Sequence, residues 1–289
     1  MFVLSLILGT QVIALFVQYK VNKAYKGIGD WLIGSSLMAL GFILMPLVSI
    51  KGLEKIARIA NPLLIIGHIF FYIGIKKFLN RKVNKWIPIS IFILFNMFYY
   101  YNMYIDNNVS IRTLAISTAI ATISLLIAYE LFFKSDKVLS SSSKFTSAVF
   151  FIYGVFYIGR IFLTVILDPA NSYIDLSLSI TATVIISIII SNLWTLGLII
   201  MINQMLNIEN HLEKNKLQLI FDTNIDAQLI TKLDDGFIVE ANEEFYKLSG
   251  YSKDEVIGQY AKNSSFWNNP EDRKTFIAEI NAKDSCENM

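Results

Sequence analysis

The chain has 289 residues, of which 54% are hydrophobic and only 17% are charged, and its mean hydropathy is +0.52. Soluble globular domains contain about 45–50% apolar and about 25% charged residues, so this composition argues against an ordinary soluble enzyme. Residues 1–205 carry a net charge of +9 and residues 206–289 a net charge of −7, which predicts a membrane-embedded first part followed by an acidic part in water.

Seven apolar runs are long enough to cross a hydrocarbon core of about 30 Å, which takes roughly 20 helical residues. They are residues 2–17, 31–50, 60–78, 86–105, 111–133, 145–167 and 178–201. The first run does not read as a cleaved secretory signal, because its basic residues follow the apolar stretch instead of preceding it. We therefore expect an all-α polytopic membrane bundle of seven transmembrane helices over residues 1–205.

The basic residues of the loops predict the orientation of these spans. If the N-terminus lies outside, the cytoplasmic loops and their flanks carry eleven Lys and Arg, and the outer loops carry four. Cytoplasmic loops of membrane proteins carry an excess of Lys and Arg. We therefore expect a multi-pass protein of the cell membrane with its N-terminus outside and its C-terminal segment in the cytoplasm.

Two polar side chains inside the spans, His68 and Arg160, are candidate ligand-binding residues. A charged group in the middle of a bilayer costs roughly 2.5–3.5 kcal/mol on insertion scales, so such residues invite a functional explanation. At about 1.5 Å per residue, both lie roughly 10–12 Å below the outer surface, at a depth that allows a shared cavity. In this interpretation Arg160 binds an anion and neutral His68 supplies a hydrogen bond. In the alternative, Arg160 extends to the outer surface and His68 bonds a backbone carbonyl of a neighbouring helix.

A connector, residues 201–220, follows the last span. Apolar residues at coiled-coil spacing form a candidate signal-relay seam, namely Met201, Met205, Ile208, Leu212 and Leu219. Neither Pro nor Gly interrupts this stretch, so one helix can continue from the membrane into the cytoplasm. Two interpretations stay open: a homodimeric signalling helix, or a monomeric amphipathic helix that lies on the next domain.

The cytoplasmic segment begins with a predicted β-hairpin. Residues 227–233 and 237–241 are rich in strand-forming side chains and flank Asp235-Gly236, a pair that favours a hairpin turn. Asn242 follows directly and has the side chain of a helix cap. The pattern predicts a hairpin that leads into a short helix. Ser252, with Glu255 three residues later, has the spacing of a capping box at the start of a further helix.

Four features between residues 217 and 282 occur in a fixed order. They are the Asp-Gly turn, the Asn that opens the next helix, Gly250-Tyr251-Ser252, and Glu255 followed by Ile257-Gly258. In this order they resemble the N-terminal half of a PAS domain. The resemblance implies a sensory or dimerisation module whose five-stranded sheet has the order second-first-fifth-fourth-third.

Only the first two strands of that sheet are recognisable in the sequence. We therefore expect an incomplete α+β PAS domain over residues 221–289, whose first strand has an open edge. On this interpretation the chain is the front portion of a longer protein or a truncated gene product.

The resemblance also bears on cofactors. A flavin photosensor needs a cysteine in the mid-domain helix, and the comparable stretch, residues 263–267, has none. A haem needs an axial ligand, usually His, and no His follows His211. The single cysteine, Cys286, and the two histidines leave too few ligands for a metal cluster. Cyclase, kinase and phosphate-loop signatures are absent from the sequence. We expect no cofactor, no metal site and no enzyme activity in this chain.

Seven spans, a helical connector and a PAS module are together similar to the sensory front end of bacterial diguanylate cyclases and histidine kinases. This resemblance implies a membrane sensor that relays an unknown small-molecule stimulus to the PAS module and to a missing or separate output domain. The expected partners are the lipid bilayer and a second copy bound through the connector, and no nucleic acid. The alternative is a small-molecule or ion transporter with a regulatory cytoplasmic tail.

Overall fold

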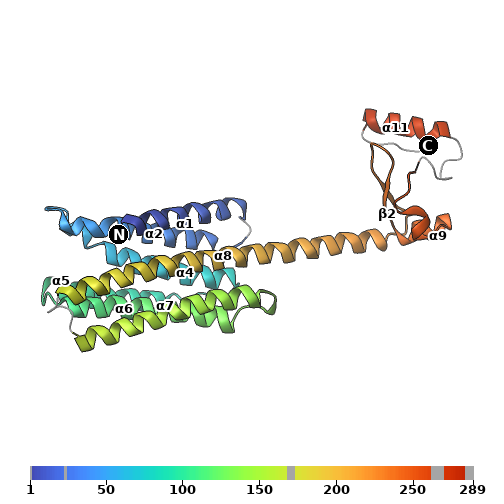
Figure 1. Ribbon diagram of the computed structural model, residues 1–289. Coiled ribbons are helices and arrows are strands. Elements are labelled where there is room, and N and C mark those ends of the chain that lie inside the picture. The colour runs from blue at the N-terminus through green and yellow to red at the C-terminus, as the bar shows by residue number, and fades with distance from the viewer. Residues whose placement is uncertain (1, 23–24, 168–172, 262–269, 284–289) are drawn as a thin grey trace. The chain divides into compact units, whose positions relative to one another are not determined.

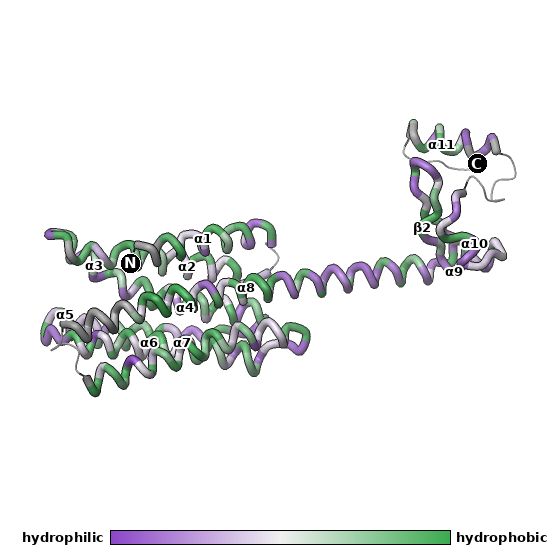
Figure 2. The backbone as a smooth tube through the Cα atoms, viewed as in Figure 1, coloured by the Kyte–Doolittle hydropathy of each residue, from purple (hydrophilic) through white to green (hydrophobic). Residues whose placement is uncertain are grey.

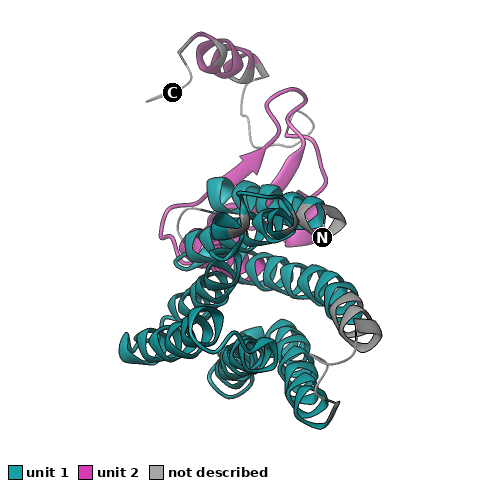
Figure 3. Ribbon diagram, turned by 90° about the vertical axis from the view of Figure 1, so that its left-hand side faces the viewer, with its two compact units in different colours: residues 1–206 teal, residues 207–289 magenta. Residues whose placement is uncertain are grey.

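The computed structural model describes residues 2–22, 25–167, 173–261 and 270–283. The chain divides into two compact units, Met1–Leu206 and Asn207–Met289 (Figure 3). The first unit is a bundle of helices, and the second combines a β-hairpin with short helices (Figure 1).

Seven long helices cover the apolar runs of the sequence. Their bounds are α1 Phe2–Val21, α2 Ile28–Leu44, α4 Ala60–Phe78, α5 Trp86–Tyr104, α6 Val109–Phe133, α7 Ser140–Leu167 and α8 Tyr173–Asp222. Between them lie the short elements η1 (Met45–Ser49), α3 (Glu54–Ala57) and η2 (Lys137–Leu139). Hydrophobic residues dominate the bundle, whereas the C-terminal part of α8 is largely hydrophilic (Figure 2).

Among the residues that the structure describes, five helices are long and apolar enough to cross a membrane. These candidate spans are Ile28–Val48, Lys55–Phe78, Val109–Phe133, Lys137–Ile166 and Ala182–Asp222. Within the part of the chain that the structure describes, α1 provides only the shorter apolar helix Leu6–Val21. Helix α5 is not among the five, and its four tyrosines and two asparagines lower its hydropathy. The helices therefore support membrane localisation, but they do not by themselves establish seven spans.

Helices α2 and α4 pack with their backbones in close approach. A Cβ atom built on Gly34 would lie 2.8 Å from the carbonyl oxygen of Gly67, and one built on Gly67 would lie 2.8 Å from the carbonyl oxygen of Gly34. The same antiparallel register brings Gly27 beside Gly74. Small residues allow helix backbones to approach in this way in membrane proteins. The two helices are therefore held at a separation that only glycine permits.

Helix α6 contacts α4, α5 and α7, and α2 contacts α1 as well as α4. Helix α8 joins this bundle through side chains. The amide nitrogen of Gln11 in α1 donates a hydrogen bond of 3.1 Å to the Ser191 hydroxyl, and the Trp194 ring stacks on Phe150 of α7 at 5.3 Å. Helix α8 is thus an integral part of the first unit up to its boundary.

Two ion pairs lie where α4 and α6 end and α2 begins. Lys76 Nζ is 3.0 Å from the Glu130 carboxylate, and both side chains are only 13% exposed. Lys77 Nζ is 2.7 Å from the Asp30 carboxylate. These four residues link α4 to α6 and to α2 at the end of the bundle that the sequence assigns to the cytoplasmic side.

The second unit contains the predicted hairpin, formed by β1 (Leu229–Thr231) and β2 (Ile238–Ala241). Leu229 pairs with Ala241, and the register shifts between Ile230 and Thr231. Gly236 has φ +73°, a left-handed conformation that glycine adopts without a steric penalty. The hairpin prediction is confirmed, although both strands are shorter than the predicted runs.

Residues 258–261 pair with the edge of β2 that does not face β1. The backbone nitrogen of Ile238 donates to Gln259 O at 2.8 Å, and the nitrogen of Gly258 donates to Ile238 O at 3.1 Å. The nitrogen of Ala261 donates to Gly236 O at 2.8 Å. This pairing was not predicted, because nothing in the local sequence pattern marks residues 258–261 as strand-like.

Three helices complete the second unit, α9 (Glu243–Ser249), α10 (Lys253–Val256) and α11 (Pro270–Lys283). The Asn242 side chain caps α9 by accepting a hydrogen bond of 3.0 Å from Phe245 N, as predicted. The Glu255 carboxylate accepts hydrogen bonds from the backbone nitrogen of Ser252 at 2.8 Å and from its hydroxyl at 2.7 Å. The predicted capping box is confirmed.

Candidate functional site

Arg160 lines a pocket of about 350 Å³ in the first unit, formed by residues of α2, η1, α4, α6, α7 and α8. Its apolar lining consists of Phe42, Met45, Pro46, Val48, Leu64, Ile116, Ile120 and Val184. Its polar lining consists of Asn61, Tyr157, Arg160, Thr183 and Ser187. The pocket lies in the half of the bundle that the sequence assigns to the outer side. It combines an apolar wall with one cation.

The Arg160 guanidinium has unused hydrogen-bonding capacity. Its Nε atom is buried and has no hydrogen-bond partner, and its Cζ atom lies 5.9 Å from the ring centroid of Tyr157. Over the described ranges, no ion pair includes Arg160. Hydrogen bonds from a guanidinium to a carboxylate or phosphate are among the strongest in proteins, especially away from water. The pocket is therefore suited to an anion.

His68 does not line this pocket. Its side chain is buried, and its Nδ1 lies 2.8 Å from the carbonyl oxygen of Leu64, one turn earlier in the same helix. The imidazole stacks on Tyr153 at 6.0 Å and meets Trp194 edge-on at 5.9 Å. The structure therefore does not bring His68 and Arg160 together in this pocket, because the imidazole packs against the rings of Tyr153 and Trp194 instead. The alternative is also corrected, since His68 bonds a carbonyl of its own helix and not of a neighbour.

Tyr153 nevertheless contacts both His68 and two residues of the pocket. The Tyr153 hydroxyl, whose ring stacks on His68, lies 3.4 Å from the Tyr157 hydroxyl and 3.3 Å from the Ser187 hydroxyl. Both Tyr157 and Ser187 line the Arg160 pocket. Sequence reasoning missed these residues, although the spacing of Tyr153, Tyr157 and Arg160 places them on one face of a helix.

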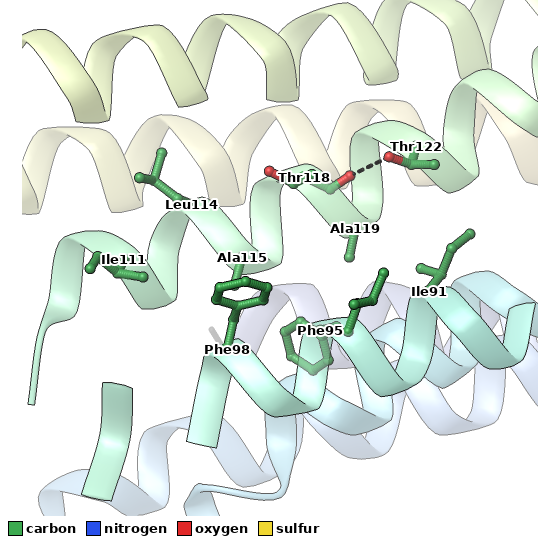
Figure 4. Close-up of a pocket in the computed structure, with 10 residues that line it drawn as sticks. Ile91, Phe95, Phe98, Ile111, Leu114, Ala115, Thr118, Ala119 and Thr122 are labelled. Carbon is green, nitrogen blue, oxygen red and sulfur yellow. Dashed lines mark hydrogen bonds between the residues drawn. The ribbon is translucent and has the colours of Figure 1, made fainter. Parts of the chain in front are cut away.

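A second pocket, of about 420 Å³, lies between α5 and α6 (Figure 4). Apart from two threonines it is lined by apolar side chains, namely Ile91, Leu94, Phe95, Phe98, Ile111, Leu114, Ala115 and Ala119. The Thr122 hydroxyl donates within α6 to Thr118 O at 2.8 Å, as drawn in Figure 4. Leu94 and Phe98 are about half exposed, so the groove opens to the outside of the bundle. It suits a lipid chain and lacks a charged group that would select a ligand.

Helix α8 takes part in the Arg160 pocket and is also fixed to α7 near the end of the first unit. Thr183, Val184 and Ser187 line the pocket. Further along, Gln204 accepts a hydrogen bond of 2.5 Å from the Ser142 hydroxyl and donates one to a carbonyl of η2. A change at the pocket therefore acts on a helix that is also hydrogen-bonded to the bundle at Gln204.

The five predicted relay residues fall into two groups. Met201 is fully buried in the core of the first unit, and Met205 packs against that core. Ile208 is half-buried, whereas Leu212 and Leu219 are 65% and 63% exposed. The seam is therefore not one continuous surface, because its first two members are used by the bundle. Leu212 and Leu219 remain available to a second helix.

The last turn of α8 is hydrogen-bonded to Asn242, whose side chain is fully buried. The Asn242 amide nitrogen donates hydrogen bonds to the carbonyl oxygens of Phe221, at 3.2 Å, and Asp226, at 2.8 Å. Its amide oxygen accepts hydrogen bonds from the backbone nitrogens of Gln228, at 2.8 Å, and Phe245, at 3.0 Å. One side chain thus ties the last turn of α8 to the start of β1 and to α9.

A third pocket, of about 740 Å³, lies in the second unit between the hairpin, α9 and α11. Its lining includes Leu229, Phe245, Leu248, Phe276 and Ile280. Among the residues that the structure describes, no group of His, Cys, Asp and Glu could hold a metal ion. Residues 263–267 and Cys286, which bear on the predicted lack of a flavin, lie outside the described residues.

Comparison with known proteins identifies one region of the chain. Residues 215–283, in the C-terminal part, match the family model of the PAS domain. Neither the curated proteins nor the solved structures include a significant match to the chain. The matched region begins within α8 and ends with α11, so the last turns of α8 belong to the PAS region of the protein.

Proposed function

We propose that this protein is a membrane sensor in which the helical bundle receives a stimulus and α8 relays it to the cytoplasmic PAS region. PAS domains indicate a signalling role, and the long apolar helices indicate membrane association. In this proposal seven helices span the membrane, the N-terminus lies outside, and the chain itself carries out no catalysis. An output domain separate from residues 1–289 uses the signal.

The observation that carries the proposal is the extent of α8. One helix, Tyr173–Asp222, lines the Arg160 pocket near its start and is bonded to Asn242 at its end. A helix transmits displacement along its axis because its backbone hydrogen bonds hold each residue to its neighbours. The same element therefore contacts both the site of input and the hairpin that the PAS match contains.

The hydrogen bonds that α8 makes with the bundle are individually weak. Interhelical hydrogen bonds in membranes average about 0.6 kcal/mol each. The Tyr153–Ser187 and Gln11–Ser191 bonds are of this kind. A ligand that binds two arrangements of α8 with different affinities shifts their populations by that difference. A difference of about 1–2 kcal/mol is enough to change the populations five- to thirtyfold.

The exposed part of the connector provides a second function, which is contact with another copy of the chain. Leu212 and Leu219 are seven residues apart and exposed, as in a coiled-coil seam. We propose that two copies pair along this stretch, so that a shift of α8 changes how the two PAS regions face each other.

Disulfide cross-linking in native membranes tests the relay. Leu212→Cys and Leu219→Cys are each introduced with Cys286→Ser, and the rate of cross-linking between copies is measured. Ser187→Ala removes the hydroxyl that faces Tyr153 and is expected to change this rate about threefold, the equivalent of one interhelical hydrogen bond. Ser36→Ala, which removes a hydroxyl bonded within α2, is the matched control and should leave the rate unchanged.

Cross-linking that is insensitive to Ser187→Ala, or absent at both positions, would contradict the relay. Uptake of a solute that persists after residues 207–289 are deleted would instead favour a transporter with a regulatory tail.

A further inference from the structure

We infer that the Arg160 pocket binds a small amphiphilic anion, with a carboxylate or phosphate head at the guanidinium and a short apolar tail between the helices. The role of this anion as the stimulus rests on the proposed function, whereas its binding to the pocket does not. The inference follows from the charge, the walls and the size of the pocket.

The head of the ligand is determined by Arg160. It is the one charged group among the described residues that line the pocket. Its buried Nε atom lacks a partner, and a guanidinium presents its donors in a planar fork that matches a carboxylate or phosphate. A single cation balances a single negative charge, so a monoanionic head fits better than a dianionic one.

Neutral polar groups lie beside the guanidinium and can complete the recognition of the head. Asn61 donates its amide hydrogen to the Tyr99 hydroxyl at 2.8 Å, so its orientation is fixed. The hydroxyl groups of Tyr157 and Ser187 also line the pocket, and a hydroxyl is able to donate to an anion. A head that engages Ser187 contacts α8 directly.

The tail is determined by the rest of the lining. Eight of the lining side chains are apolar, among them Phe42, Ile116 and Ile120. A volume of about 350 Å³ lies at the lower end of the range for small-molecule sites, about 300–1,000 Å³. A long, branched or doubly chained molecule would not fit entirely inside. The pocket suits a medium-length chain, or one end of a lipid whose remainder lies in the bilayer.

Such an anion has two sources, the water phase and the membrane. The experiment uses the full-length chain in nanodiscs and measures thermal unfolding. In one arm, decanoate is titrated into phosphatidylcholine nanodiscs, with decylamine and decanol as matched ligands of the opposite and of no charge. In the other arm, phosphatidylglycerol replaces part of the phosphatidylcholine and nothing is added.

Decanoate is expected to raise the unfolding temperature of the wild type, and decylamine and decanol are not. Arg160→Gln should weaken the apparent affinity for decanoate by about tenfold or more, as expected when a charge-assisted hydrogen bond is lost. Lys82→Gln removes an exposed cation beyond the end of α4 that is opposite to the pocket residues Asn61 and Leu64, and it should leave the affinity unchanged. If the anion is a lipid, phosphatidylglycerol raises the unfolding temperature in an Arg160-dependent way and decanoate adds nothing further.

A second variant of the pocket, Val48→Trp, allows the test to be made even if Arg160→Gln does not fold. Val48 is 58% exposed and lines the pocket, so Val48→Trp should fill the pocket without disturbing the core and should abolish the effect of either anion. Equal stabilisation by decylamine or decanol would overturn the inference, as would stabilisation that survives both Arg160→Gln and Val48→Trp. The relay is measured by cross-linking without any ligand, so that result would leave the proposed function standing.

Discussion

The buried side chain of Asn242 donates a hydrogen bond of 3.2 Å to the carbonyl oxygen of Phe221, in the last turn of α8. The same amide group caps α9 and holds the chain that enters β1. The end of the long helix and the start of the hairpin are therefore stabilised by one residue, and neither can move far without breaking its hydrogen bonds.

Asn242→Ala is expected to lower the free energy of opening of the hairpin by about 1–3 kcal/mol, because it leaves buried backbone groups without partners. Asn242→Asp should also destabilise, since it places an acceptor against the carbonyls of Phe221 and Asp226. Hydrogen–deuterium exchange of β1, β2 and α9 measures the effect. Asn210→Ala, at an exposed position of α8, is the control and should leave the exchange rates unchanged.

Gly34→Ala is expected to destabilise the bundle by about 1–3 kcal/mol, the usual cost of overpacking. The new Cβ would lie 2.8 Å from the carbonyl oxygen of Gly67, and a backbone atom cannot move aside as a side chain does. Gly159→Ala has open space around the new methyl group and should be neutral or stabilising. Thermal unfolding in detergent compares the two variants. Equal loss of stability in both would argue against close backbone contact between α2 and α4.

Glu130→Gln is expected to destabilise the first unit by about 2–4 kcal/mol, because it leaves the Lys76 ammonium in a site that is only 13% exposed. Replacing both residues with Met should restore most of the stability, since no unpaired charge remains. Glu271→Gln breaks a pair whose side chains are 69–72% exposed and should have no measurable effect. If the double variant is as unstable as Glu130→Gln, the loss has a cause other than the unpaired lysine.

The capping box of α10 predicts a pH dependence. Hydrogen bonds from the backbone nitrogen and then the hydroxyl of Ser252 lower the pKa of Glu255. A carboxylate whose pKa is lower in the folded state stabilises the fold above its unfolded pKa, about 4.3 for Glu, and loses that contribution as the pH falls through the folded value. Ser252→Ala should therefore accelerate amide exchange in α10 relative to the wild type at pH 7. The difference should shrink below about pH 4. A difference that stays constant with pH would show that the charge of Glu255 is not involved.

The elements that sequence reasoning predicted well depend on local patterns. The Asp235-Gly236 turn, the Asn242 cap and the Ser252–Glu255 capping box each involve residues within a few positions of one another, and the structure confirms all three. The PAS resemblance combined such local features, and the family match over residues 215–283 extends over nearly the same stretch.

What could not be predicted depends on how helices face each other. Depth along a helix axis placed His68 level with Arg160, but the direction of each side chain around the axis depends on the neighbouring helices. The imidazole is enclosed by Tyr153 and Trp194, from two other helices. Similarly, Met201 has the spacing of a coiled-coil residue, but its side chain is buried in the core of the bundle and cannot contact a second copy.

The Gly34–Gly67 contact also restricts which helices are able to slide. Two backbones that touch lack the flexible side chains that would absorb a displacement, and a shift by one residue would drive a neighbouring side chain into the facing carbonyl. Helices α2 and α4 thus form a fixed frame. The freedom needed for a conformational switch is left to the helices outside that frame. Helix α8, which is bonded to α1 and α7 through hydroxyl and amide groups, is the one that leads out of the bundle.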